Sequence, residues 1–205
     1  MRTLTKEIQS KISPKLAINI LKEGNKRFVT NLKLHRNLLE QVNETSKDQY
    51  PIAIILSCID SRTSAELIFD QGLGDIFSVR VAGNIVNEDI LGSMEFACGV
   101  AGSKLIVVLG HTNCGAIKGA CDDVKLGNLT KLIEKIKPSI EMSNFEGEKN
   151  SANQKYVEDV ANINVHRMVE QIEEKSPILK KMKNEGKIDI VGAMYSVDNG
   201  KVKFL

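Results

Sequence analysis

Two short segments contain most of the residues in this chain that could do chemistry. They read Cys-Ile-Asp-Ser-Arg at 58–62 and His-Thr-Asn-Cys at 111–114. Two thiolates and one imidazole are ligand types that Zn²⁺ prefers, and a site with three protein ligands keeps a fourth coordination position open for chemistry. The segments therefore predict a zinc site formed by Cys58, His111 and Cys114, provided that folding brings the three side chains together.

The spacing of these residues is not that of a structural zinc finger, which supplies paired C-x-x-C knuckles and four closed ligands. Because two thiolates cancel the charge of zinc, a bound water should be acidified less than in a three-histidine site, where its pKa is about 7. A nearby acceptor would then help to orient the hydroxide. Asp60 can be that acceptor, and Arg62 can hold it as a bidentate ion pair. Without that pair, Asp60 could itself bind zinc as a fourth ligand in a closed state.

A run of apolar residues precedes each segment, at 52–56 and at 105–109. Short apolar runs bounded by turn signals are typical of fully buried strands in a parallel sheet. Sites in open α/β sheets form outside the carboxyl ends of the strands. If the two strands lie close together in the sheet, the cysteines and the histidine converge despite their separation in sequence.

The rest of the chain alternates between predicted helices and strands. Ser13 followed by Pro14 indicates the start of a helix that runs to about Val29, and the polar stretch 35–48 is expected to be loop. Further strands are expected at 75–80 and 188–195, with a last short strand after the turn at 198–200. Further helices are expected at 64–71, 88–102, 115–124, 128–141, 152–174 and 177–185. This order predicts a three-layer α/β fold, with a central mainly parallel β-sheet flanked by helices, in a single domain over 1–205.

Composition narrows the classes of function. The chain has 205 residues, 42% of them hydrophobic, which suits one globular domain with a proper core. A formal net charge of +2 without a basic stripe gives no indication of nucleic acid as a partner, and the apolar runs are too short to span a bilayer. The first residues lack the apolar core of a signal peptide, so the expected location is cytoplasmic. In that compartment four cysteines favour metal binding or catalysis over disulfides.

An ordered set of motifs resembles the β-class carbonic anhydrases. It consists of Cys-x-Asp-Ser-Arg at 58–62, Ala-Gly-Asn at 82–84 and Gly-His-Thr-Asn-Cys-Gly at 110–115, within a similarity that runs from about 24 to 195. The resemblance implies a zinc enzyme in which zinc hydroxide attacks carbon dioxide to give bicarbonate and a proton. It also implies zinc ligation by Cys58, His111 and Cys114, and a gating role for Asp60 and Arg62.

The same resemblance implies a substrate pocket. Gln49 matches the glutamine whose amide contacts the substrate in the plant-like subgroup, and Phe77 and Ala82 match apolar wall positions. Phe96 stands where that subgroup has a tyrosine, and the backbone N–H of Gly115 is expected near the substrate. Pocket walls in the family come partly from a second subunit, so a homo-oligomer of at least two chains is implied, with N-terminal helices that extend to the partner.

Three other functions are compatible with some of these residues. Hydrolysis of carbonyl sulfide or carbon disulfide would use the same zinc chemistry on the same scaffold. A thiol redox protein fits poorly, because Cys58 and Cys114 are not in a C-x-x-C arrangement. A non-catalytic, zinc-stabilised module would need a closed four-ligand site, in which Asp60 could be the fourth ligand.

His35 and His166 are expected at the surface, and Cys98 and Cys121 are expected to be structural.

Overall fold

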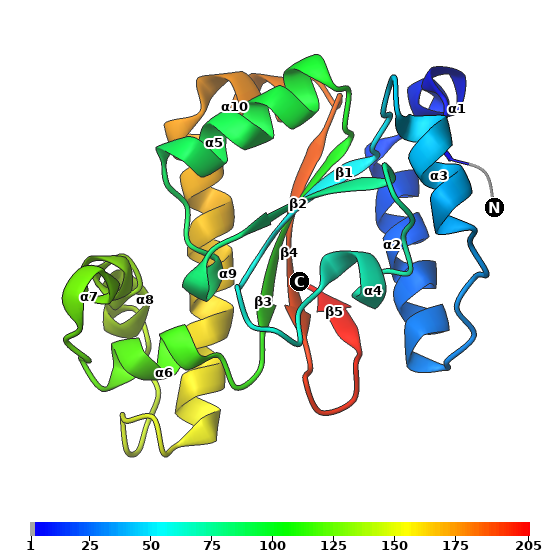
Figure 1. The fold of residues 1–205 in the computed structure, drawn as a ribbon. Coiled ribbons are helices and arrows are strands. Elements are labelled where there is room, and N and C mark those ends of the chain that lie inside the picture. The colour runs from blue at the N-terminus through cyan, green and yellow to red at the C-terminus, as the bar shows by residue number, and fades with distance from the viewer. Residues whose placement is uncertain (1–2) are drawn as a thin grey trace.

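A computed structural model describes residues 3–205 of the chain. Its centre is a five-stranded sheet with the strand order β2-β1-β3-β4-β5 (Figure 1). The first four strands in that order are parallel, and β5 is antiparallel to β4. The bounds of the strands are β1 Ala53–Ser57, β2 Ile76–Arg80, β3 Leu105–His111, β4 Asp189–Tyr195 and β5 Val202–Phe204. The structure thus confirms the mainly parallel sheet expected from the sequence.

Helices cover both faces of this sheet, which gives the predicted three layers. In Figure 1, α5, α9 and α10 lie to one side of the strands, and α2 and α4 lie to the other. The helices are α1 Lys6–Lys11, α2 Pro14–Val29, α3 Leu38–Thr45, α4 Ala65–Ile68, α5 Glu88–Glu95, α6 Gly115–Cys121, α7 Gly127–Glu134, α8 Lys137–Glu141, α9 Gln154–Lys175 and α10 Pro177–Asn184. A 3₁₀ turn, η1 (Ala82–Asn84), follows β2, and a π-helical segment, η2 (Phe96–Val100), continues α5.

Alternating residues of the buried strands form two separate hydrophobic clusters. Ile54 on β1 and Ile106 on β3 belong to the cluster under α5, α6 and α9. Their neighbours Ile55 and Leu105 belong to the cluster under α2 and α4. Successive side chains of a strand point to opposite faces of the sheet, so a strand that is buried on both faces must be apolar throughout. This explains why the apolar runs predicted these strands correctly.

Two expectations about helices are wrong. The stretch 35–48 is not all loop: α3 begins after Asn37, whose side chain accepts a hydrogen bond from the backbone N–H of Glu40. Gln41 is buried on this helix and accepts a hydrogen bond from the N–H of Leu73, so a polar contact holds α3 in place without an apolar stripe. The expected helix at 128–141 is split into α7 and α8. Pro138 lies in the first turn of α8, where its missing N–H is tolerated, whereas it would interrupt a continuous helix.

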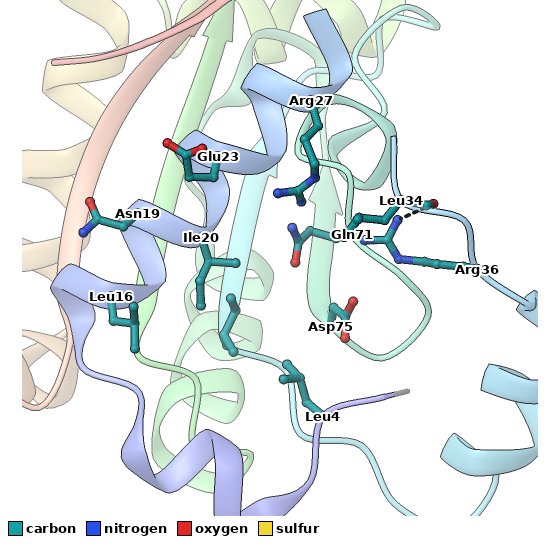
Figure 2. A pocket seen from close by; sticks show the side chains of 11 residues that line it. Leu4, Leu16, Asn19, Ile20, Glu23, Arg27, Leu34, Arg36, Gln71 and Asp75 are labelled. Atoms are coloured by element: carbon teal, nitrogen blue, oxygen red, sulfur yellow. Dashed lines mark hydrogen bonds between the residues drawn. The ribbon is translucent and has the colours of Figure 1, made fainter. Parts of the chain in front are cut away.

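A cluster of charged residues lies beside the amino ends of β1 and β2. Asp70 accepts hydrogen bonds from Arg27 Nε and Arg36 Nη1, each at 2.5 Å. The two arginines also line a cavity of about 370 Å³ between α2 and the start of β1 (Figure 2). Asp70 therefore joins α2 and the segment before α3 to the chain that returns from α4 to β2.

No helix within residues 3–205 combines the length and the apolar character needed to cross a bilayer.

Candidate metal centre

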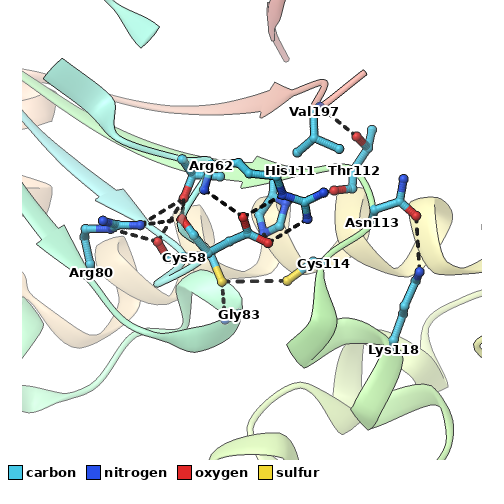
Figure 3. Close-up of polar contacts among 12 residues, drawn as sticks. Cys58, Arg62, Arg80, Gly83, His111, Thr112, Asn113, Cys114, Lys118 and Val197 are labelled. Atoms are coloured by element: carbon cyan, nitrogen blue, oxygen red, sulfur yellow. Dashed lines mark hydrogen bonds and ion pairs between the residues drawn. The ribbon is translucent and has the colours of Figure 1, made fainter. Parts of the chain in front are cut away.

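The three predicted zinc ligands converge at the carboxyl edge of the sheet. Cys58 directly follows β1, His111 ends the adjacent strand β3, and Cys114 immediately precedes α6. Their ligand atoms all lie within 4.8 Å of one another, and all three residues are buried. The two sulfur atoms are 3.9 Å apart, close to the separation of about 3.8 Å expected for two thiolates bound tetrahedrally at about 2.3 Å from zinc. Figure 3 shows both cysteines beside His111.

His111 is held in the orientation that a metal ligand needs. Its Nδ1 lies 2.8 Å from the carbonyl oxygen of Thr112, and an Nδ1–H that donates to this oxygen leaves the lone pair on Nε2. Nε2 is buried and has no hydrogen-bond partner among the described residues. A buried polar atom without a partner is costly, and a metal ion between the two sulfurs and Nε2 would remove that cost. The residues present therefore fit Zn²⁺.

The turn from His111 to Cys114 is fixed from two sides. Asn113 has a φ of 57°, in the left-handed region that asparagine tolerates, and it accepts a hydrogen bond from Lys118 Nζ at 3.2 Å. The N–H of Val197 donates to Thr112 Oγ1 at 3.0 Å, which ties the turn to the segment after β4 (Figure 3). These contacts bring Cys114 back toward Cys58.

The two thiols have opposite tendencies to ionise. The contact with Cys114 lowers the pKa of Cys58, and the nearby His111 ring and a hydrogen bond from the N–H of Gly83 lower it further. The pKa of Cys114 is raised by its contact with Cys58 and by burial. The protein alone therefore favours ionisation of Cys58. Ionisation of Cys114 as well would place two negative sulfurs 3.9 Å apart, and a cation between them would relieve that repulsion.

Asp60 and Arg62 form the bidentate pair that the sequence predicts. Arg62 Nε and Nη2 donate to the two carboxylate oxygens of Asp60 at 2.9 and 2.8 Å, and the N–H of Arg62 donates to one of them at 3.0 Å. The hydrogen bonds from Arg62 hold the pKa of Asp60 well below its usual range, so the carboxylate stays ionised at neutral pH. Asp60 Oδ2 lies 4.0 Å from His111 Nε2, which puts the acceptor next to the metal ligands.

Two residues that the sequence analysis did not single out hold the loop that carries Cys58 and Asp60. Thr63 is buried, and its Oγ1 lies 3.0 Å from the carbonyl oxygen of Cys58 and 2.9 Å from that of Asp60. Arg80, the last residue of β2, donates to the same two carbonyl oxygens (Figure 3). The end of β2 pairs with the end of β1 only in the folded sheet, so no sequence spacing could have indicated this role for Arg80.

Of the three predicted apolar wall residues, Phe77 and Phe96 lie together and Ala82 lies elsewhere. The rings of Phe77 and Phe96 contact each other edge to face with centroids 6.3 Å apart, and both line a cavity of about 730 Å³ between β2 and α5. The lining of that cavity includes none of the three metal ligands. Ala82 lies separately in η1, half-buried and next to Gly83.

The two predicted polar contacts with the substrate lie at opposite ends of β1. Gly115 is exposed, directly follows Cys114, and has open space around its Cα. Gln49 is exposed in the loop before β1, whereas Cys58 follows β1. The structure therefore separates Gln49 from the metal ligands of its own chain, and its role remains a prediction.

The two histidines expected at the surface are exposed, and the two cysteines expected to be structural lie outside the metal centre. His35 is exposed in a loop, and His166 is exposed on α9. Cys98 is buried in η2, where burial raises the pKa of its thiol to about 12, and Cys121 is half-buried at the end of α6. Neither cysteine belongs to the group of possible metal ligands.

Comparison with known proteins identifies the family. The carbonic anhydrase family model matches residues 53–202. Carbonic anhydrase 2 of Mycobacterium tuberculosis is 35% identical over 195 residues, which cover 92% of this chain and 91% of the relative. A carbonic anhydrase of Mycolicibacterium smegmatis is 36% identical, with 93% of each chain covered. Among solved structures, the β-carbonic anhydrase CafA of Aspergillus fumigatus has a TM-score of 0.72 at 24% identity, covering 93% of this chain and 89% of that one.

The fold and the Cys–His–Cys site define a zinc enzyme of the α/β class. The chain belongs to the β-carbonic anhydrase family, and its activity is the reversible hydration of carbon dioxide to bicarbonate.

Proposed function

We propose that Asp60 orients the attacking water in this reaction and that Arg62 holds Asp60 in place. Cys58, His111 and Cys114 would hold zinc, which would act as a Lewis acid and make water a nucleophile at neutral pH. The low pKa of Asp60 keeps its carboxylate an acceptor of hydrogen bonds, and its Oδ2 lies 4.0 Å from His111 Nε2. This single observation, an ionised carboxylate aimed at the ligand group, carries the proposal.

Carbon dioxide is small and apolar, so an apolar wall with few polar contacts suits it. We assign that wall to Phe77, Ala82 and Phe96. The N–H of Gly115 is proposed to polarise one oxygen of the substrate, since Gly115 directly follows a ligand and has open space beside it. Addition of water to carbon dioxide gives bicarbonate and one proton, which passes to solvent or buffer.

A homo-oligomer would complete this pocket. Gln49 lies at the end of β1 opposite to the ligands of its own chain, so we propose that its amide contacts the substrate across an interface with a second copy. Phe96, whose ring contacts Phe77 on the edge strand β2, is 52% exposed, and Val100 at the end of the same π-helical segment is 74% exposed, as expected of a surface that another chain covers. Two β-carbonic anhydrases of Sordaria macrospora, one of them similar in fold to this chain with a TM-score of 0.70, are described as tetrameric.

The proposed location is the cytoplasm. All four cysteines are free, including the pair with sulfurs 3.9 Å apart, and such thiols persist in a reducing compartment.

The test is stopped-flow hydration of carbon dioxide by the Asp60→Asn variant. Loss of the charged acceptor should lower kcat/KM by about 100-fold or more, while the zinc content per chain stays that of the parent. Asp123→Asn is the matched control, because Asp123 also accepts hydrogen bonds from basic side chains but lies at the surface away from the site. Equal rates for Asp60→Asn and the parent, at equal zinc content, would refute the assigned role.

A further inference from the structure

We infer that Asn164 on α9 is a positioning residue for the Cys58 thiolate, acting through the backbone of Gly83. This inference rests on the proposed metal site. It adds a residue that lies 53 positions beyond His111 in the sequence and does not touch any of the ligands.

Asn164 is fully buried and aimed at the turn that contacts Cys58. Its side chain is 0% exposed, and Nδ2 donates to the carbonyl oxygen of Gly83 at 2.9 Å. Ser139 Oγ lies 3.2 Å from Asn164 Oδ1, and Arg167 Nη1 donates to Ser139 Oγ at 3.1 Å. The amide of Asn164 therefore has a partner at each end, which fixes its orientation.

Gly83 passes this orientation to the metal ligand. Its N–H donates to Cys58 Sγ at 3.4 Å (Figure 3). A hydrogen bond of this kind stabilises a thiolate, and it depends on how the Ala82–Gly83 peptide is turned. Asn164 binds the next peptide, Gly83–Asn84, so it acts on that orientation through the φ and ψ angles of Gly83. Gly83 has a φ of 70°, and a Cβ at this position would lie 2.7 Å from Ile136 Cδ1. Glycine suits this left-handed backbone best, and its conformational freedom must be restrained from outside if the N–H is to stay on the sulfur.

α9 supplies that restraint at two points on one face. Four residues after Asn164, Met168 Sδ accepts a hydrogen bond from the N–H of Val86 at 3.2 Å. Residues four apart lie on the same face of a helix. Asn164 and Met168 thus hold the segment from Gly83 to Val86 against α9, and Asn164 is the one that binds the residue in contact with Cys58.

A purely structural role for Asn164 makes a different prediction. A buried asparagine that only satisfies a carbonyl group would affect the stability of the fold and leave the metal–thiolate bond unchanged. A positioning role requires that the metal ligand itself changes when Asn164 is replaced. The deciding measurements are therefore the zinc dissociation constant and the thiolate-to-metal charge-transfer band of the cobalt(II)-substituted protein.

The experiment compares Asn164→Ala with Asn162→Ala in the full chain. Asn162 lies on the same helix and is half-buried, but its Nδ2 donates to Glu158 of α9 itself, so it is a matched control. Partners outside the ligand shell typically contribute 10- to 100-fold in metal affinity. Because Asn164 acts through one further hydrogen bond, we expect zinc affinity to fall about tenfold, the lower end of that range, with a shifted charge-transfer band. Asn162→Ala should change neither.

The results separate this inference from the proposed function. If the parent protein binds zinc and a folded Asn164→Ala variant keeps the parent's affinity and cobalt spectrum, the inference is wrong and the proposed function stands. If the parent binds no zinc, the proposed function itself fails. Should Asn164→Ala not fold, Ser139→Ala removes the hydroxyl that orients the amide and keeps Asn164 itself. A spectrum shifted in the same direction would support the inference, and an unchanged one would overturn it.

Discussion

Two aspartate–arginine clusters in this molecule use the same chemistry for different ends. Asp70 is bound by Arg27 and Arg36, which precede it by 43 and 34 residues, and its side chain is 2% exposed. Asp60 is bound by Arg62, only two residues away, and its side chain is 17% exposed. The first cluster joins segments that are far apart in sequence, beside the cavity in Figure 2. The second links two residues that are already neighbours along the backbone.

The two carboxylates differ in how many hydrogen bonds from the protein they already accept. The oxygens of Asp70 accept from two guanidinium groups and from the N–H of Leu34, deep in the protein. Asp60 Oδ2 accepts one hydrogen bond, from Arg62, and lies 4.0 Å from His111 Nε2. An ion pair that is local and half-exposed contributes little to stability. This pair lies beside the buried metal ligands, which agrees with the proposal that Arg62 orients Asp60 for chemistry.

The largest effect on stability is expected when the Asp70 cluster is broken. Asp70→Asn leaves the guanidinium of Arg36, which is 8% exposed, without the carboxylate that it pairs with. Removing one partner of a buried pair typically costs about 3–5 kcal/mol, and we expect a loss of that size in the free energy of unfolding measured with urea. Carbon dioxide hydration per folded molecule should stay at the parental rate, because Asp70 is remote from the metal centre.

Asp123→Asn provides the comparison for this measurement, since it removes an equally charged carboxylate from a surface pair. Its side chain is 58% exposed, so its unfolding free energy should change by less than about 1 kcal/mol. A similarly small change for Asp70→Asn would contradict the view that the Asp70 cluster holds distant segments together.

The converse change is Arg62→Lys, which keeps the charge but loses the two-pronged geometry. Lysine is a point charge and cannot donate to both oxygens of Asp60 as the guanidinium does. We expect kcat to fall about tenfold, equivalent to about 1.4 kcal/mol in the activation barrier. The unfolding free energy should hardly move, since the Arg62 side chain is 51% exposed. A variant with full kcat would show that a bidentate hold on Asp60 is not needed.

The sequence was sufficient wherever local chemistry decides the outcome. The apolar runs at 52–56 and 105–109 correctly predicted β1 and β3, because strands buried on both faces must be apolar. The ligand types at 58, 111 and 114 then predicted a zinc site, and the folded chain brings these three side chains together in a group that could hold a metal ion. α3 was missed because its burial depends on the single polar residue Gln41, not on an apolar stripe.

Contacts between distant segments could not be predicted in this way. Nothing in the spacing of Arg27, Arg36 and Asp70 indicates that the three meet, and the same holds for Asn164 and Gly83. Asn164 gave no local signal, since a buried asparagine resembles any polar residue of an amphipathic helix. The role proposed for Gln49 requires a second chain, so one folded chain does not test it.

The smallest expected effect is on how stability changes with pH. Burial raises the pKa of Asp70, but hydrogen bonds from Arg27 and Arg36 outweigh burial and lower the pKa overall. A carboxyl whose pKa is lower in the folded state stabilises the fold above its unfolded value of about 3.9, and this stabilisation is lost as the pH falls through the folded value. The unfolding free energy of the parent should therefore decline with falling pH below about pH 4 to 5. Asp70→Asn should decline less steeply in urea titrations at pH 5, 4 and 3.5, because it has one fewer proton to take up on unfolding. Parallel slopes for the two proteins would mean that Asp70 titrates alike in both states, and the contrast between the two clusters would then rest on their geometry alone.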